Sequence, residues 1–373
     1  MNGLIYATGD LAPDRDDVDA CFAATAPLLH QAELVFGQLE TSFASRGVRL
    51  PQARHAVLAR PEGAAALARA GFDVISFAGN HCLDWGNEAF AETLSHLRAA
   101  GLDVIGAGEN IAAARTPSIR RLADGTRVAF LAYCSILPQG YWAEAHRPGC
   151  APLRAHTLYE QVEHDQPGTP ARIHTFAHAA DLAAMQDDIR AARARADVVL
   201  VSMHWGIHFV RAVIADYQRE AARAAIAAGA DAILGHHAHI LKGIELIEGR
   251  PVFYSLCNFA TDLRMTPEHA ARPSFKEIQR LADRWEPDFE SLYNFPPASR
   301  LSMIARLRVA DGRVREAGFV PVYIDRDAVP RALARSEARH REVVDYVAAV
   351  GAEAGFETPL RVCDDHVAIG TPA

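Results

Sequence analysis

The sequence predicts an α/β fold in which sheets and helices form layers. Short apolar runs that end in small or polar residues alternate along the chain with alanine-rich stretches of helical spacing. The runs are continuously apolar, which is typical of strands covered on both faces. The chain has 373 residues, half of them hydrophobic, so it can bury a large core without disulfide bonds or a partner.

Eight apolar runs are expected to form strands. They cover residues 3–10, 32–40, 72–81, 102–108, 127–135, 196–206, 230–239 and 250–259. Four alanine-rich stretches between them are expected to form helices, and several close with a glycine that favours a helix C-terminus. They cover residues 61–71, 87–101, 181–196 and 216–230.

Two irregular segments interrupt this alternation. Residues 137–180 are rich in proline, glycine and histidine and predict a long loop that joins two halves of the fold. Residues 266–300 predict an insert with a helix and an aromatic, proline-rich tail, which is a candidate lid for a pocket. Loops of this length are more often functional than idle.

The C-terminal part predicts a hairpin followed by a helix. Residues 300–325 form two apolar runs with Asp311-Gly312 between them, a typical hairpin turn. We therefore assign residues 1–325 to one domain. Residues 326–373 are expected to form a helical appendage packed on that domain.

Composition and charge exclude several classes of protein. The net charge is −8, and no stripe of lysine and arginine is interleaved with aromatic residues, so nucleic acid is not an expected partner. The N-terminus lacks the features of a signal peptide, and no segment approaches the ~20 apolar residues of a membrane span. We expect a soluble, cytoplasmic protein without a membrane partner.

The six cysteines are scattered without a CxxC pair, which favours reduced thiols over a disulfide framework or a zinc knuckle. Cys82 and Cys257 lie beside the polar motifs described next. For both, ordinary packing is favoured over a role as metal ligand.

Polar residues follow several of the predicted strands at the point where each strand ends. In a layered α/β fold such residues converge on one edge of the sheets, where ligands bind. Carboxylates, an amide and imidazoles together are typical ligands of Mn, Fe or Zn. The sequence therefore predicts a site for one or two divalent metal ions. The residues are Asp10, Glu40, Asn80, His81, His204, His237 and His239.

The order of these motifs resembles a known family. The series GD, LE, GNH, HWG and GHHAH, followed by VFYSLCNF, is similar to the calcineurin-like metallophosphoesterase superfamily. The resemblance is to the branch similar to the CapA proteins of poly-γ-glutamate capsule synthesis, and it extends from about residue 3 to residue 325. It implies a four-layer α/β/β/α sandwich, with two mixed sheets flanked by helices, and a catalytic domain over residues 1–325.

The resemblance also implies a role for each motif residue. Asp10 and His239 would hold the first metal ion, and Glu40 would bridge two ions. The second ion would be held by Asn80, His204 and His237.

His81 corresponds to a histidine that does not bind metal but stabilises the transition state or protonates the leaving group, and Asp84 would orient it. The chain departs from the wider superfamily at Ala12, where a histidine is usual, and at Glu40, where an aspartate is usual. One imidazole of the first metal site is therefore missing.

Four further residues are candidates for the site. His236 is expected to support the metal ligands from outside or to pack in the core. His208 and Lys242 are candidate contacts for an anionic substrate, with a solvated or packed position as the alternative. Asn258 either steadies a ligand through a hydrogen bond or forms a turn.

We therefore expect a metal-dependent hydrolase that acts on a phosphoester in a small anionic substrate. A metal-bound hydroxide would attack the ester, and His81 would act as acid or transition-state stabiliser. One alternative is a CapA-like accessory protein in polyglutamate synthesis. Another is an enzyme that acts on an amide bond in small-molecule biosynthesis.

Overall fold

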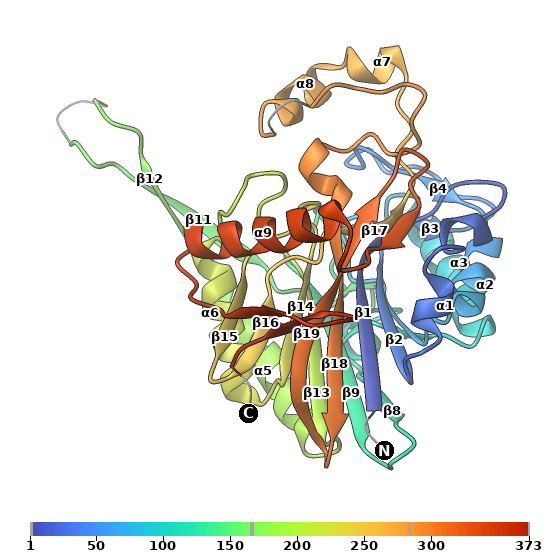
Figure 1. Cartoon of the computed structure of the whole chain (residues 1–373). Helices are drawn as coiled ribbons and strands as arrows, with labels where there is room; N and C mark the ends of the chain where they lie inside the picture. Colours follow the sequence, from blue (N-terminus) through green and yellow to red (C-terminus); the bar gives the residue numbers. More distant parts are fainter. Residues whose placement is uncertain (1–2, 165–167, 283–284, 372–373) are drawn as a thin grey trace.

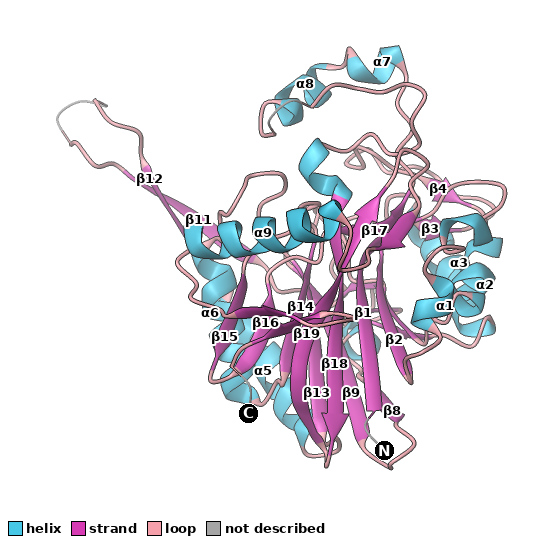
Figure 2. Cartoon of the chain, viewed as in Figure 1, coloured by secondary structure: helices cyan, strands magenta, loops and turns pink. Residues whose placement is uncertain are grey.

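Two mixed β-sheets packed face to face form the centre of the protein, with helices on their outer sides (Figure 1, Figure 2). The structure is a computed structural model that describes residues 3–164, 168–282 and 285–371. The layered α/β architecture predicted from the sequence is confirmed.

The first sheet has ten strands and contains the N-terminal strand near its middle. β1, β2, β5 and β6 form its parallel part, and the C-terminal strands extend it in antiparallel fashion. The path runs β21-β22-β19-β18-β1-β2-β5-β6, with β17 paired to β1 and β20 paired to β19. The strands are β1 (Gly3–Ala12), β2 (Leu34–Leu39), β5 (Val74–Ser76), β6 (Asp103–Ile105), β17 (Asn258–Thr261), β18 (Leu301–Ala310), β19 (Arg313–Ile324), β20 (Pro330–Ala332), β21 (Leu360–Val362) and β22 (Val367–Ile369).

The second sheet has six strands in the order β15-β16-β14-β13-β9-β8. Its four central strands are parallel, and an antiparallel strand closes each edge. The strands are β8 (Ser118–Arg121), β9 (Arg127–Cys134), β13 (Val198–His204), β14 (Ala232–His236), β15 (Ile244–Ile247) and β16 (Arg250–Phe253).

Helices cover the outer sides of both sheets. α2 and α3 pack beside the parallel part of the ten-stranded sheet, α5 and α6 pack on the six-stranded sheet, and α9 contacts one strand of each sheet, β19 and β15. The helices are α1 (Ala26–Leu29), α2 (Glu62–Arg69), α3 (Gly86–Ala99), α4 (Ile111–Ala114), α5 (Ala179–Arg193), α6 (Asp216–Ala228), α7 (Pro267–Ala270), α8 (Pro273–Gln279) and α9 (Ala338–Glu353). None of the helices in the described part of the chain is both long and apolar enough to cross a membrane.

The main hydrophobic core lies between the two sheets. The rings of Phe36 on β2 and Phe130 on β9 stack with centroids 6.0 Å apart and planes 5° from parallel. Both side chains are fully buried. This contact joins one strand of each sheet directly beneath the polar residues at the strand ends.

The run at residues 250–259, expected to form one strand, forms parts of two. It leaves the six-stranded sheet after Phe253 and enters the ten-stranded sheet at Asn258, where it pairs with β1. The crossing segment lies so close to its neighbours that a Cβ atom at Gly9 would be 2.1 Å from the Cys257 carbonyl oxygen. A Cβ atom at Gly235 would be 2.3 Å from the Tyr254 carbonyl oxygen. Only glycine fits at these two positions.

The sequence suggested one long loop over residues 137–180, and this prediction is wrong. They contain the short strand β10 (Gly149–Cys150), which pairs with β7 (Ala107–Gly108), and a hairpin of β11 (Ala155–Glu160) and β12 (Arg172–Ala177). The hairpin projects away from the body of the protein (Figure 1). Most side chains of the hairpin are exposed, and its sequence accordingly shows no continuous apolar run that would predict strands.

The description of residues 326–373 as a helical appendage also needs correction. The segment contains helix α9, but it contributes β20, β21 and β22 to the ten-stranded sheet as well. These strands are only three residues long, too short to give a sequence pattern. The predicted hairpin is present as β18 and β19, and Asp311 and Gly312 turn with φ of 51° and 68°.

Candidate metal site

The predicted site residues come together where strands of both sheets end. Asp10 lies near the end of β1, Glu40 directly follows β2, and His204 is the last residue of β13. The strand registers place Asp10 beside Asn258 and His204 beside His236. The site is therefore built from both sheets, with the carboxylates on one and the imidazoles on the other.

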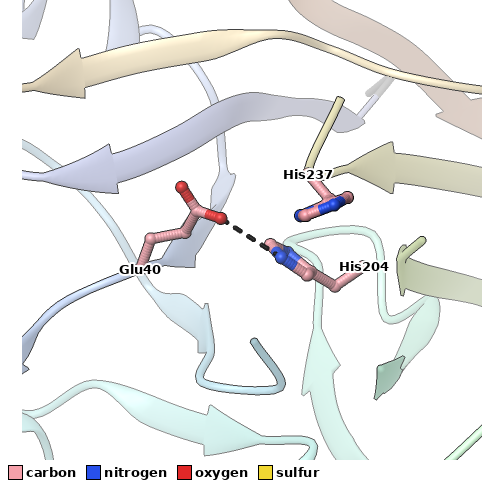
Figure 3. A group of neighbouring side chains, drawn as sticks. All are labelled: Glu40, His204 and His237. Carbon is pink, nitrogen blue, oxygen red and sulfur yellow. Dashed lines mark ion pairs between the residues drawn. The ribbon is translucent and has the colours of Figure 1, made fainter. Parts of the chain in front are cut away.

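Two groups of side chains lie close enough to hold a metal ion, and both include Glu40. The first is Glu40, His204 and His237, and the second is Asp10, Glu40 and His239; in each group one ligand atom per residue lies within 4.8 Å of the others. Figure 3 shows the first group, in which Oε1 of Glu40 lies 3.2 Å from Nε2 of His204. Glu40 is the residue shared between the groups, the position of a bridging carboxylate.

Asn80 and Asn258 each place an amide oxygen against one of these histidines. Oδ1 of Asn80 lies 2.7 Å from Nε2 of His204, and Oδ1 of Asn258 lies 2.8 Å from Nδ1 of His239. The Asn258 amide group donates to the hydroxyl of Tyr293 over 2.7 Å, which fixes its oxygen toward His239. Both oxygens face the region where metal ions would be bound.

The backbone at the histidine triplet is in an unusual conformation. His237 and His239 have φ of 83° and 55°, the left-handed region that non-glycine residues seldom adopt. Each such residue costs about 1–3 kcal/mol and persists where the surrounding structure enforces it, often at functional sites. This conformation turns both side chains toward the carboxylates.

The charge state of the site suits a cation. Asp10 is fully buried and Glu40 is 7% exposed, and neither pairs with a lysine or arginine among the described residues. Burial, and then the charge of Asp10, raises the pKa of Glu40 to about 7. Burial opposes ionisation of Asp10 too, but the hydrogen bond and charge of His236 prevail and lower its pKa. Two buried carboxylates this close favour a positive ion between them.

His204 and His237 are held neutral, as metal binding requires. Burial lowers the pKa of His204 to about 4 and, together with neighbouring histidines, lowers that of His237 well below its usual value. Nδ1 of His237 and Oε1 of Glu40 are buried and have no hydrogen-bond partner in the described part of the chain. Buried polar atoms normally have partners, so unsatisfied ligand atoms around one point fit a metal ion.

A separate pair of side chains, His81 and Asp84, lines a cavity together with Glu40, His237 and His239. Nδ1 of His81 donates to Oδ2 of Asp84 over 2.6 Å, and the hydroxyl of Tyr141 donates to the other carboxylate oxygen over 2.9 Å. Burial opposes protonation of His81, but the hydrogen bond and charge of Asp84 prevail and raise its pKa. His81 is therefore suited to hold a proton beside the candidate metal site.

His236 and Asn258 lie where supporting roles would place them. Nδ1 of His236 lies 3.0 Å from Oδ1 of Asp10, and the backbone amide of His237 donates to Oδ2 of Asp10 over 3.2 Å. Both oxygens of Asp10 are thus held in place. His236 is in neither ligand group and is fully buried.

Lys242 does not line the cavity and takes the packed position, which was the alternative to a contact with an anionic substrate. Its ammonium group donates to the backbone carbonyls of Val210 and Val213, and the side chain is 2% exposed. Burial lowers its pKa to about 8. Lys242 instead holds the segment that carries His208, which does line the cavity.

The cysteines beside the motifs are not ligands in either group. Sγ of Cys82 lies 3.0 Å from Sγ of Cys150, and Cys257 donates to the carbonyls of His239 and Ser299. Burial raises the pKa of all three thiols that could approach the site, those of Cys82, Cys134 and Cys257. They pack as protonated thiols.

The site opens into a cavity of about 580 Å³, which Glu40, Asn80, His81, His237 and His239 line on one side. Sequence reasoning missed Tyr141 and Tyr293, which fix Asp84 and Asn258. Both tyrosines lie in the irregular segments 137–180 and 266–300, so no strand pattern pointed to them. Their aromatic character within otherwise polar loops was the available signal.

Part of the chain is similar to two curated proteins of Bacillus. The chain is 27% identical over 250 residues to the PGA biosynthesis protein CapA of Bacillus subtilis (strain 168), covering 67% of this chain and 58% of that protein. It is 27% identical over 252 residues to the capsule biosynthesis protein CapA of Bacillus anthracis, covering 67% and 55%. The matched region thus spans little more than half the length of these relatives.

Among solved structures, the chain is similar to GAP50, described as the anchor in the inner membrane complex of Plasmodium. The match covers 94% of this chain and 95% of that one, with a TM-score of 0.32 and 8% identity. The family described as bacterial capsule synthesis protein PGA_cap matches residues 5–263, which include Asp10, Glu40 and the histidine triplet. The chain belongs to this bacterial capsule synthesis protein family.

Proposed function

We propose that the protein is a metal-dependent hydrolase of a phosphoester bond in a small anionic substrate. The observation that carries this proposal is the convergence on one cavity of two ligand groups that share Glu40 and of the His81–Asp84 pair. A divalent ion bound there would supply Lewis acidity and would lower the pKa of water toward ~7.

The residues of the chain divide the work of hydrolysis. Glu40, Asp10 and the histidines position the ions and balance their charge. Water adds its oxygen to phosphorus, the ester P–O bond breaks, and the departing oxygen takes a proton. His81, protonated and oriented by Asp84, is the group placed to donate that proton, a contribution of typically ~10² to 10⁴ in rate. No serine or cysteine nucleophile is needed.

The first metal site has fewer protein ligands than the wider superfamily implies. Ala12 lines the cavity beside Asp10 and offers no ligand atom. Asp10, Glu40 and His239 remain, and three protein ligands with an open position are typical of catalytic zinc sites. Oδ1 of Asn258, 2.8 Å from Nδ1 of His239, is a further oxygen atom close to this group.

A second candidate is an accessory role in the synthesis of a glutamate polymer without hydrolysis. It is favoured by the names of the two Bacillus relatives, which refer to PGA and capsule biosynthesis. An accessory protein of this kind would keep the fold and would not depend on His81. The two candidates are therefore separated by the effect of removing that imidazole.

The decisive experiment combines elemental analysis of the purified protein with hydrolysis of a generic aryl phosphate. Wild type is compared with His237→Ala and His81→Ala, and with His146→Ala as control, because His146 is exposed and does not line the cavity. The hydrolase proposal expects metal to be lost or diminished in His237→Ala but retained in His81→Ala, with activity reduced in both.

The control variant should keep both metal and activity. A wild-type protein that binds no Mn, Fe or Zn after reconstitution would refute the proposal. Metal binding without hydrolysis of phosphoesters would favour the accessory role or amide chemistry.

A further inference from the structure

Part of the cavity wall is apolar and mainly aromatic. Phe209, Phe275, Ile278, Trp285 and Phe295 line it, and they come from the 205–210 turn and the insert at 266–300. Phe209, Phe275 and Trp285 are less than 10% exposed. A site that had to bind only a small, fully hydrated anion would not need such a wall.

The aromatic rings form a continuous series that begins at a candidate metal ligand. The Phe209 ring stacks on His239 with centroids 5.5 Å apart, and it lies 4.9 Å from the Trp285 ring. Trp285 in turn meets Phe275 of α8 edge-on at 5.1 Å. A ligand that enters the cavity therefore meets the metal site at one end and this series of rings at the other.

The aromatic series belongs to a small core that residues of the insert form together with residues from the neighbouring loops. Phe209, Met265, Phe275 and Trp285 are among its buried members, and the Trp285 indole donates to the Asn294 carbonyl over 2.9 Å. This core lies above the sheet ends, where α7 and α8 form a separate cap (Figure 1). The rings are thus held in place rather than freely exposed.

The charges around the cavity do not suit a polyanion. Arg54 is the one arginine or lysine among the described residues that line it. Asp262, also in the lining, is paired with Arg15, and both oxygens of Asp84 accept hydrogen bonds. A long polyanion would leave its repeated charges without cations and the aromatic wall without a partner.

We infer that the substrate of this site is a small amphiphile, in which an anionic group is joined to an aromatic or similarly flat apolar group. The anionic group meets the metal site, and the apolar group packs on Phe275, Ile278 and Trp285. A volume of about 580 Å³ is within the usual range for small-molecule sites. The placement of the anionic group at the metal site rests on the proposed function, whereas the placement of the apolar group rests on the aromatic wall.

The test measures binding rather than turnover. Isothermal titration calorimetry compares naphthylmethylphosphonate with methylphosphonate on the Mn-loaded protein. Burial of the naphthyl group is expected to tighten binding by at least about tenfold. Phe275→Ala and Ile278→Ala should each reduce this preference by about threefold or more and leave the affinity for methylphosphonate unchanged.

Phe289→Ala is the matched control. Phe289 lies in the same insert but is 53% exposed and does not line the cavity, so this variant should keep the full preference. Ile278 is only partly buried, so its variant remains informative if Phe275→Ala disturbs the insert.

Equal affinity for the two phosphonates, or no binding of either, would overturn the inference even if aryl phosphate is hydrolysed. A strong naphthyl preference in a protein that hydrolyses no phosphoester would support the inference while the proposed function fails.

Discussion

Nδ1 of His81 donates a hydrogen bond to Oδ2 of Asp84 over 2.6 Å, and Asp84 is held from its other side by Tyr141. This arrangement fixes the orientation of the imidazole and raises its pKa. If His81 acts as the acid, Asp84 determines the pH range in which it holds its proton.

Asp84→Asn should lower the rate of hydrolysis by about 10- to 100-fold without loss of metal. Because the charge that raises the pKa of His81 is removed, the imidazole loses its proton at lower pH. The alkaline limb of the pH–rate profile should therefore move to lower pH. Tyr141→Phe removes one hydrogen bond to Asp84 but keeps the charge of that carboxylate, so it should move the alkaline limb less. An unmoved limb in Asp84→Asn would argue against His81 as the acid.

A divalent metal ion should stabilise the fold because its ligands belong to two sheets. At a free metal concentration 100 times the dissociation constant, binding adds about 2.7 kcal/mol, which for a chain of this length is about 3 °C in melting temperature. The measurement is thermal unfolding with Mn or Zn and with a chelator.

His237→Ala should reduce this metal-dependent rise in melting temperature, whereas His208→Ala, outside both ligand groups, should retain it in full. A metal-dependent rise in melting temperature of equal size in both variants would show that the metal ion binds outside these two ligand groups.

Lys242→Met should weaken the fold and leave substrate binding unchanged. The substitution removes the donor to the carbonyls of Val210 and Val213. An unsatisfied buried acceptor costs about 1–3 kcal/mol, so the free energy of unfolding in urea should fall by a similar amount. KM for an aryl phosphate should be unaffected. A large increase in KM at unchanged stability would restore Lys242 as a substrate contact.

His208 should make the metal-free protein less stable in acid. Burial lowers the pKa of its imidazole to about 4, against about 6.5 in an unfolded chain. Between these values the unfolded state binds the proton and the folded state does not, so stability falls as pH falls from 7 to 5. The contribution is about 1–2 kcal/mol. Replacement by asparagine should flatten the pH dependence of the unfolding free energy by that amount, and an unchanged slope would contradict the assigned environment.

Most of the layered fold could be predicted because its central strands are covered on both faces. Residues 127–135 and 196–206 form β9 and β13, whose burial is nearly complete. The run at 250–259 was misread as one strand because its apolarity is continuous, while its division between two sheets depends on pairing with β1. The hairpin of β11 and β12 was missed for the opposite reason, since most of its side chains are exposed.

The candidate site was predictable to the extent that it follows strand ends. Asp10, Glu40 and His204 come directly from that rule. Lys242 shows its limit, because a sequence does not reveal whether an ammonium group faces a cavity or two backbone carbonyls. The aromatic wall was equally hidden, since Phe209 and Trp285 lie 76 positions apart and meet only through the folding of the insert.

The crossing of the chain from one sheet to the other, between Phe253 and Asn258, has a consequence for how the protein tolerates mutation. The segment is the covalent link that sets the spacing of the two sheets next to the ligand groups, and Gly9 and Gly235 allow its close approach. Substitutions in the core between the sheets, at Phe36 or Phe130 for example, would alter that spacing by fractions of an ångström. Metal affinity, which depends on ligand distances to a few tenths of an ångström, should therefore decline before the fold does. Function in this chain would be lost to distant core substitutions that expression and solubility do not reveal.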